Sequence, residues 1–105
     1  MFNVVFLVKR RPDLSPEEFA RYWVDDHTPL TANVPGIRAY KLYTVTGLHD
    51  GEPVFDGVAI LSFDDRTAHD TAIASPEFAA AIADAPNFQD VAVTTSFFGD
   101  EHVIV

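Results

Sequence analysis

The chain alternates between apolar runs of strand length and segments whose apolar residues recur at helical spacing. Residues 2–9 form an apolar run rich in Val and Phe, which predicts a buried strand. In the segment that follows, Phe19, Tyr22 and Trp23 fall on one stripe of a helical wheel. This segment is therefore predicted to be a helix that lies on a core.

Local signals mark both ends of this helix. Ser15 is predicted to be the N-cap of an S-x-x-E capping box, with Pro16 as the first helical residue. Pro29 disfavours helical geometry at the residue before it. The regular helix is therefore predicted to end near Asp26 or His27.

The rest of the chain repeats these patterns in the order strand, strand, helix, strand. Strands are predicted over residues 37–46, 54–63 and 91–98, and a second helical region over about 65–85. Ser75 and Pro76 repeat the cap-and-proline signal, and Gly57 indicates a bend or a close approach in its strand. With right-handed crossovers, this order predicts one α+β domain over residues 1–105 with a ferredoxin-like βαββαβ fold. Its four-stranded antiparallel sheet would carry both helices on one face.

Apolar residues occupy both faces of the predicted sheet. In the first strand, Phe6 and Val8 alternate with Val5 and Leu7. A sheet covered by helices on one side only should instead alternate apolar and polar residues. The pattern therefore predicts that a second subunit packs its sheet against the open face, giving a homodimeric α+β barrel. The apolar tail at residues 101–105 could pair across that interface.

The amino-acid composition limits the binding partners and the cellular compartment that we expect for this protein. The 105 residues are 48% hydrophobic, which is normal for one folded domain. A formal charge of −9 opposes binding to nucleic acid or to anionic membranes. There is no cysteine, which excludes disulfides and thiolate chemistry. The first residues run from apolar to basic, the reverse of a signal peptide, and are too few to cross a bilayer, so we expect a cytoplasmic protein.

His27 is the first candidate for chemistry. On a helical wheel it lies beside Trp23 at the edge of the apolar stripe, so it is predicted to face the sheet. The helix end and the neighbouring Asp25 and Asp26 favour the charged imidazole, whereas burial favours the neutral form, a balance that suits general acid–base catalysis. The alternative is a structural histidine that bonds a terminal backbone carbonyl. The pattern alone leaves both open.

Asp56 and Tyr40 are the next candidates. Asp56 is a carboxylate inside an otherwise apolar strand, which is costly unless it is hydrogen bonded or exposed. Tyr40 and Tyr43 should point to opposite faces of their strand, so one of them would line the space between sheet and helices. The alternative is that both are ordinary strand aromatics.

The remaining polar residues are expected to have no site role. Asp84 and Asn87 are interpreted as turn formers after the second helix, and His49, His69 and His102 as solvated. No histidine pair has metal-ligand spacing, and there is no phosphate-binding glycine loop or G-x-S-x-G motif. We expect no metal and no cofactor.

Four stretches of sequence together resemble the EthD family of dimeric α+β barrel proteins. They are "LVKRRPDLSPEEFARYWVDDHTPL", "VPGIRAYKLY", "GEPVFDGVAILSFDD" and "SPEFAAAIADAPNF", with "EHVIV" closing the chain. The most specific combination is the H-x-P motif after an aromatic pair, followed by P-G-[IL]-R. The resemblance implies a ferredoxin-like protomer, a homodimer formed by sheet-to-sheet packing, and an apolar cleft between sheet and helices.

The resemblance also implies a range of activities. Related dimeric barrels include cofactor-free monooxygenases, muconolactone and methylmuconolactone isomerases, and polyketide cyclases. In the methylmuconolactone-type relatives the histidine of the H-x-P motif lies in the cleft and is implicated in catalysis, which carries over to His27 here. Some dimeric barrels bind haem through a histidine, so a coloured purified protein would contradict the expected absence of a cofactor.

Two functional hypotheses follow. The first is a cofactor-independent isomerase, cyclase or lyase that acts on a small apolar, oxygen-bearing metabolite. His27 would be its general acid or base, Tyr40 or Asp56 would orient this group or the substrate, and the apolar wall would consist of Phe19, Trp23 and Phe6. The second is a non-catalytic accessory protein that binds such a metabolite for an oxygenase or a catabolic pathway. A cleft that is packed shut would leave only a stable dimer.

Overall fold

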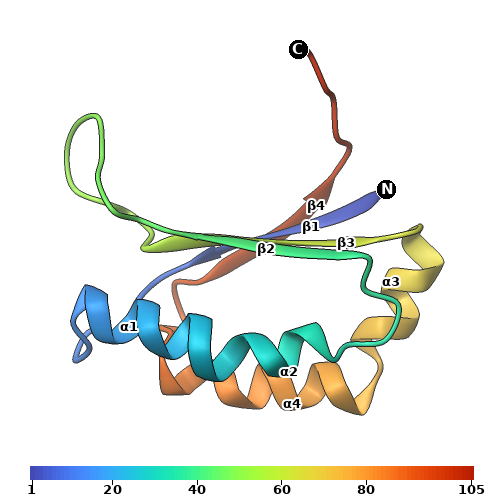
Figure 1. The fold of residues 1–105 in the computed structure, drawn as a ribbon, viewed down its shortest axis with the longest axis horizontal. Helices are drawn as coiled ribbons and strands as arrows, with labels where there is room; N and C mark the ends of the chain where they lie inside the picture. The colour runs from blue at the N-terminus through green and yellow to red at the C-terminus, as the bar shows by residue number, and fades with distance from the viewer.

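The computed structural model describes all 105 residues, which form a layer of helices on one face of a β-sheet (Figure 1). The strands are β1 (Phe2–Val8), β2 (Ala39–Thr44), β3 (Gly57–Phe63) and β4 (Thr95–Gly99). The helices are α1 (Pro16–Tyr22), η1 (Trp23–His27), α2 (Thr28–Ala32), α3 (Arg66–Ile73), α4 (Pro76–Asp84) and η2 (Ala85–Asn87). All strand pairs are antiparallel in the order β2-β3-β1-β4. The predicted ferredoxin-like fold is confirmed.

Both predicted helix starts are confirmed by their hydrogen bonds. The Ser15 side chain accepts the amide of Glu18 at 3.1 Å, and the Glu18 carboxylate accepts the amide of Ser15 at 3.0 Å. Ser75 caps α4 in the same way by accepting the amide of Phe78 at 3.1 Å. These caps fix where the two long helices start on the sheet.

The first helix does not end at Asp26 or His27, contrary to the prediction. It continues through a π-helical turn, η1, into α2, and the amide of Thr28 bonds the carbonyl of Trp23, five residues earlier. This shift leaves the carbonyl of Val24 to face Pro29, which has no N–H. The Thr28 hydroxyl donates to that carbonyl at 2.6 Å. The π turn therefore accommodates the proline instead of ending the helix.

All three strands after the first helix begin later than the sequence pattern predicts. β2 begins at Ala39 instead of residue 37, β3 at Gly57 instead of residue 54, and β4 at Thr95 instead of residue 91. The delay before β4 has a local cause, because the carbonyl of Asp90 accepts the amides of Val93 and Thr94 at 3.1 and 3.0 Å. These amides form a turn and are unavailable to the sheet.

Gly57 confirms the predicted close approach. A Cβ at this position would overlap the ring of Trp23 and lie 2.6 Å from the carbonyl oxygen of Tyr43. Trp23 is 1% exposed, and together with Phe19, Phe63 and Phe88 it is among the largest fully buried side chains. The glycine allows the indole ring to lie directly on the sheet.

The other face of the sheet carries an apolar surface without helices. Val5 lies opposite Ile60 and Phe97, and Leu7 lies opposite Val58, so these five side chains share the face turned away from the helices (Figure 1). Phe97 is 50% exposed. Apolar area of this kind marks an interaction surface.

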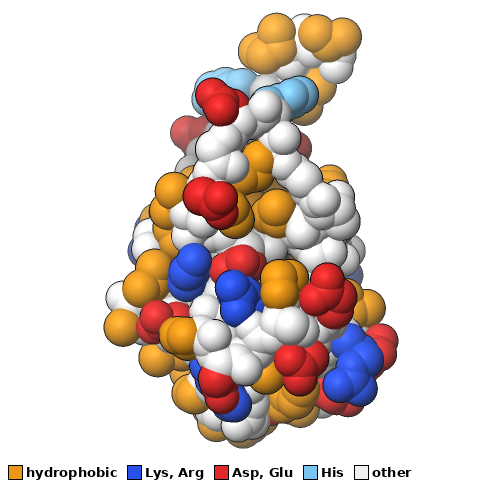
Figure 2. Space-filling model, turned by 90° about the vertical axis from the view of Figure 1, so that its left-hand side faces the viewer, with side chains coloured by type: hydrophobic (Ala, Val, Ile, Leu, Met, Phe, Trp, Pro, Cys, Tyr) orange, Lys and Arg blue, Asp and Glu red, His pale blue; other side chains and the backbone are white.

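The C-terminal residues lie outside the two layers. Val103, Ile104 and Val105 are each more than three-quarters exposed, and Figure 2 shows hydrophobic side chains at one end that stand clear of the body of the molecule. Pairing of this tail with a second subunit remains a prediction. None of the helices has the length and apolar character that a membrane-crossing segment requires.

Candidate functional site

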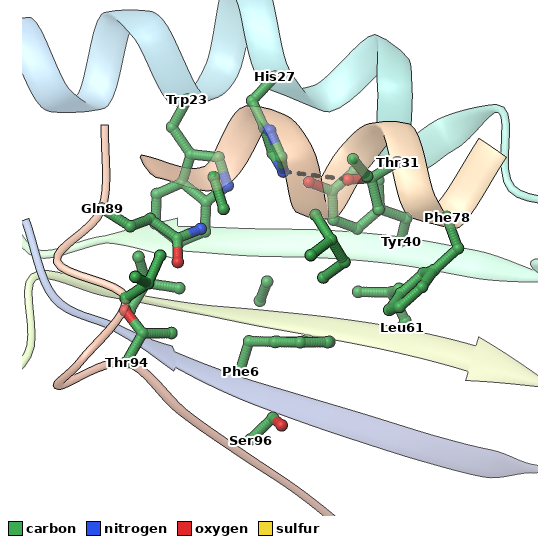
Figure 3. Close-up of a pocket in the computed structure, with 16 residues that line it drawn as sticks. Phe6, Trp23, His27, Thr31, Tyr40, Leu61, Phe78, Gln89, Thr94 and Ser96 are labelled. Atoms are coloured by element: carbon green, nitrogen blue, oxygen red, sulfur yellow. Dashed lines mark hydrogen bonds between the residues drawn. The ribbon is translucent and has the colours of Figure 1, made fainter. Parts of the chain in front are cut away.

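A cavity of about 230 Å³ lies between the sheet and the helices, and the lining residues in Figure 3 come from both layers. Eleven of its sixteen lining residues are hydrophobic. An apolar cavity of about 150 Å³ is large enough for benzene, so this one can hold a substituted ring. The cleft is therefore open rather than packed shut.

His27 lies in the wall of this cavity, on the π turn η1. It is 6% exposed, and its ring centroid lies 4.6 Å from that of Phe88. Its Nδ1 is 2.8 Å from the Oδ2 of Asp84, and its Nε2 is 3.2 Å from the hydroxyl of Thr31 (Figure 3). The structure thus buries His27 and pairs it with a carboxylate, rather than with a backbone carbonyl.

Asp84, the last residue of α4, is held by three donors. The hydroxyl of Tyr22 donates to its Oδ1 at 2.6 Å, the amide of Asn87 donates to the same oxygen at 3.0 Å, and His27 occupies Oδ2. Burial tends to raise the pKa of the Asp84 carboxyl, but the hydrogen bonds from Tyr22, His27 and Asn87 outweigh burial and hold this pKa below its ordinary value. Asp84 is therefore ionised at neutral pH.

The ionised carboxylate determines which nitrogen of His27 carries the proton. Because Asp84 can only accept, Nδ1 of His27 must donate to it. In the neutral imidazole, Nε2 is then unprotonated and accepts a hydrogen bond from the hydroxyl of Thr31. The imidazole ring lines the cavity. This is the arrangement that a general base requires.

Asp84 and Asn87 were expected to form only a turn, and sequence reasoning missed their contact with the site. One signal was available. An acidic residue at the C-terminal end of a helix opposes the helix dipole, so its position needs a compensating interaction. His27, Tyr22 and Asn87 provide that compensation.

Tyr40 lines the cavity, as one of the two strand tyrosines was predicted to do, while Tyr43 is 61% exposed on the other face. Burial raises the pKa of the Tyr40 hydroxyl, and the nearby Thr31 and Trp23 side chains oppose part of this shift. Tyr40 therefore remains a hydrogen-bond donor at neutral pH. It brings a second polar group to the part of the cavity where Thr31 meets His27 (Figure 3).

Two of the three residues that were predicted to form the apolar wall line the cavity. Trp23 and Phe6 line it (Figure 3). Phe19 does not line it but packs behind Trp23, with ring centroids 5.4 Å apart. Phe19 supports the wall from the core.

Asp56 does not lie in the cavity. It precedes β3, where its carboxylate accepts the amide of Arg10 at 2.9 Å and lies 3.6 Å from the side chains of Lys9 and Arg10. Its own amide donates to the carbonyl of Val8 at 2.8 Å. These contacts join the end of β1 to the start of β3, so the position of Asp56 corrects the expectation that it orients His27 or a substrate.

His69 is buried, which corrects the expectation that it is solvated. It is 6% exposed, and its ring lies 4.9 Å from that of Phe2 and 5.6 Å from that of Phe63. Its Nδ1 lies 2.9 Å from the carboxylate of Asp70. His49 and His102 are exposed. No group of three or more His, Cys, Asp or Glu side chains is arranged to hold a metal ion.

Comparison with known proteins places this fold and site in a class. A 28% identical relative from Rhodococcus erythropolis is an uncharacterised 11.0 kDa protein of the thcB-thcC intergenic region, and the match covers 99% of both chains. The crystal structure of an EthD family protein from Bacillus halodurans is 25% identical, with a TM-score of 0.81 over 97% of this chain and 100% of that one. A dimeric ferredoxin-like protein from Thermobifida fusca is 15% identical, with a TM-score of 0.72 over 93% of this chain and 88% of that one.

These similarities define a small α+β protein with a ferredoxin-like fold. A model of the EthD domain matches residues 11–92, which include both His27 and Asp84. The chain belongs to the EthD family, as the sequence resemblance indicated.

Proposed function

We propose that this protein binds a small apolar, oxygen-bearing metabolite in the cavity and uses His27 as a general base without a cofactor. The observation that carries the proposal is the hydrogen bond between Nδ1 of His27 and the ionised Asp84, at 2.8 Å. This contact supports a basic Nε2 in a wall that is otherwise largely apolar. A base in a water-poor cavity suits proton abstraction next to a carbonyl.

The reaction class is isomerisation through an enolate. Nε2 of His27 removes a proton from the carbon next to the carbonyl, and the C–H electron pair moves into the new C=C bond. Tyr40 donates a hydrogen bond to the oxygen, which gains negative charge. In a substrate with a C=C bond beside the deprotonated carbon, the enolate is conjugated with that bond. The imidazolium returns the proton to the far carbon of that bond and the double bond moves, so no oxidant is needed and all atoms are retained. In a cyclase, the same enolate would attack a second carbonyl of the substrate.

Hydrogen exchange in D₂O tests this proposal without knowledge of the substrate. Small cyclic ketones and lactones are incubated with the protein, and loss of the C–H proton signal is followed by NMR. Protein-dependent exchange should fall about 10²- to 10⁴-fold in His27→Gln and about 10²-fold in Tyr40→Phe. His69→Gln, which changes the other buried histidine, should exchange at the rate of the unchanged protein. Equal exchange by His27→Gln and the unchanged protein would contradict a base role.

One contact favours the alternative of a non-catalytic accessory protein. The Thr31 hydroxyl lies 3.2 Å from Nε2 of His27, so both ring nitrogens already have partners in the protein. An accessory protein would bind the same neutral compounds without exchange and would tolerate His27→Gln. Thr31→Val separates the two functions, because it frees Nε2 and should raise exchange only if His27 is a base.

We further propose that the protein is a homodimer that buries the open face of its sheet. Its apolar residues include Val5, Ile60 and Phe97, and the similar protein from Thermobifida fusca is dimeric. Ile60→Lys should convert the dimer to a monomer in analytical ultracentrifugation, because it would bury a second positive charge beside Lys41 at the interface. Lys41, which lies beside Ile60 on β2, provides the control Lys41→Arg. A monomeric unchanged protein would contradict the proposal.

A further inference from the structure

The cavity has no positive charge of its own. Its sixteen lining residues include no Lys, Arg, Asp or Glu, and its only titratable side chains are His27 and Tyr40. A protonated His27 would be balanced by the ionised Asp84 beside it. The cavity therefore offers no net positive charge to an anion.

The basic side chains nearest in sequence to the cavity wall do not serve the cavity. Lys9 and Arg10 follow the cavity residue Val8, and both lie 3.6 Å from the carboxylate of Asp56. Lys41 follows Tyr40 but lies beside Ile60 on the face of the sheet turned away from the helices. Figure 2 shows acidic and basic side chains interspersed on one face of the molecule. With a formal charge of −9 on the whole chain, a carboxylate ligand would be both repelled and left unpaired after desolvation.

Gln89 brings a neutral binding group to the cavity. It lines the cavity beside Trp23 in Figure 3, and none of the side-chain hydrogen bonds of the protein involves its half-buried side-chain amide. Its backbone is fixed, because its own amide donates to the carbonyl of Ala85 at 2.9 Å and it forms a bridge with Arg10. The side chain is thus held at the cavity with a free donor and a free acceptor.

We propose that the ligand is an uncharged ring that carries two oxygen functions, and that Gln89 is the residue that recognises the second one. The first oxygen, a carbonyl, lies at His27 and Tyr40, and this part rests on the proposed function. The second oxygen, a hydroxyl or another carbonyl, bonds the amide of Gln89. Carboxylates of the same shape are rejected, because the cavity has no charge to pair with them.

Three matched compounds test this proposal by NMR titration at pH 6.5. Acetophenone has one oxygen function, 4-hydroxyacetophenone has two and is neutral, and 4-acetylbenzoate has a carboxylate in place of the hydroxyl. The unchanged protein should bind 4-hydroxyacetophenone about five- to tenfold more tightly than acetophenone, because the hydroxyl adds one hydrogen bond, to Gln89. It should bind 4-acetylbenzoate at least tenfold more weakly than 4-hydroxyacetophenone.

Two variants assign the effect to Gln89. Gln89→Leu should bind acetophenone unchanged and lose the five- to tenfold preference for the hydroxyl compound. Gln89→Arg should bind 4-acetylbenzoate about tenfold more tightly than the unchanged protein does. Thr71→Ala, which alters an exposed polar residue of α3 outside the cavity, serves as the control and should keep the original preference.

The outcomes separate this inference from the proposed function. Retention of the preference by Gln89→Leu, tighter binding of 4-acetylbenzoate by the unchanged protein, or no binding of any of the three compounds would each overturn the inference. If the preference follows Gln89 while His27→Gln exchanges hydrogen at the unchanged rate, the ligand class stands and the base role alone fails.

Discussion

The protein contains two buried histidines that look alike locally and differ in their surroundings. The side chains of His27 and His69 are each 8% exposed, and each places Nδ1 within 2.9 Å of a carboxylate. Asp84, the partner of His27, comes from another helix and is 16% exposed. Asp70, the partner of His69, is the next residue in the chain and is 56% exposed.

This difference separates a histidine that a buried carboxylate holds in place from a histidine paired with a solvated carboxylate. Asp84 accepts three hydrogen bonds in a largely buried place, so it holds both the orientation and the tautomer of His27. The carboxylate of Asp70 is largely hydrated and also accepts a hydrogen bond from Nε of Arg66 at 3.3 Å. It therefore restrains the ring of His69 only weakly. The burial of the partner, rather than of the histidine, distinguishes the two pairs.

The largest effect confined to the surroundings of His27 is expected from a larger residue at position 57. Gly57→Ala would push the Trp23 ring off the sheet and should lower the free energy of unfolding by about 3 kcal/mol, the upper part of the range for overpacked cores. Chemical denaturation measures this change. Gly99→Ala is the matched control, because no atom lies within 4 Å of its added Cβ. An equal loss of unfolding free energy in Gly57→Ala and Gly99→Ala would contradict the close packing of Trp23 on Gly57.

Removal of the buried carboxylate should have the next largest effect. Asp84→Ala leaves the Nδ1 of His27 and the hydroxyl of Tyr22 without an acceptor and should cost about 2 kcal/mol of unfolding free energy. Tyr22→Phe, which leaves Asp84 two donors, should cost about 1 kcal/mol. The ¹⁵N shifts of His27 should also show mixed tautomers in Asp84→Ala. An unmixed tautomer would mean that Asp84 does not set the proton position.

A smaller effect should appear as a pH dependence of stability. The folded-state pKa of Asp84 is lowered, so its stabilisation is present above the unfolded pKa, about 3.9, and is lost as the pH falls through the folded pKa. The stability difference between the unchanged protein and Asp84→Asn should therefore shrink as the pH falls below about 4 and through the folded-state pKa of Asp84. Urea denaturation at several pH values measures it. A difference that grows as the pH falls would reverse the assigned shift.

The smallest effect is expected at the second pair. Asp70→Ala removes an exposed carboxylate and should leave the melting temperature unchanged within error, because hydrated ion pairs contribute little. Differential scanning calorimetry provides the comparison with Asp84→Ala. A comparable loss in the two variants would show that the two histidine pairs are equivalent.

Features set by neighbouring residues could be predicted from the sequence. The Ser15 capping box depends on contacts three residues apart, and the close approach at Gly57 followed from one missing side chain. The order of segments with strand-like and helix-like apolar spacing was enough to predict the fold. That His27 faces the sheet also followed from its spacing to Trp23, whereas its place in a cleft was implied by the family resemblance, and its use as a base remains a proposal.

Features set by distant residues could not be predicted. Asp84 and His27 are 57 residues apart, so their contact depends on how α4 lies against α1 and α2. His69 has a polar neighbour in sequence, and its burial depends on Phe2 and Phe98 from two other strands. The π turn was hidden because Pro29 more often ends a helix than continues it.

The π turn accommodates one extra residue in the helix that carries the site. The exposed residues Val24, Asp25 and Asp26 lie in this wide turn, between Trp23 and His27. Deletion of Val24 would leave Trp23 and His27 three residues apart. Side chains three or four residues apart share one face of an α-helix, so both would still face the sheet. The length of the exposed segment between them can therefore change by one residue without separating the two side chains.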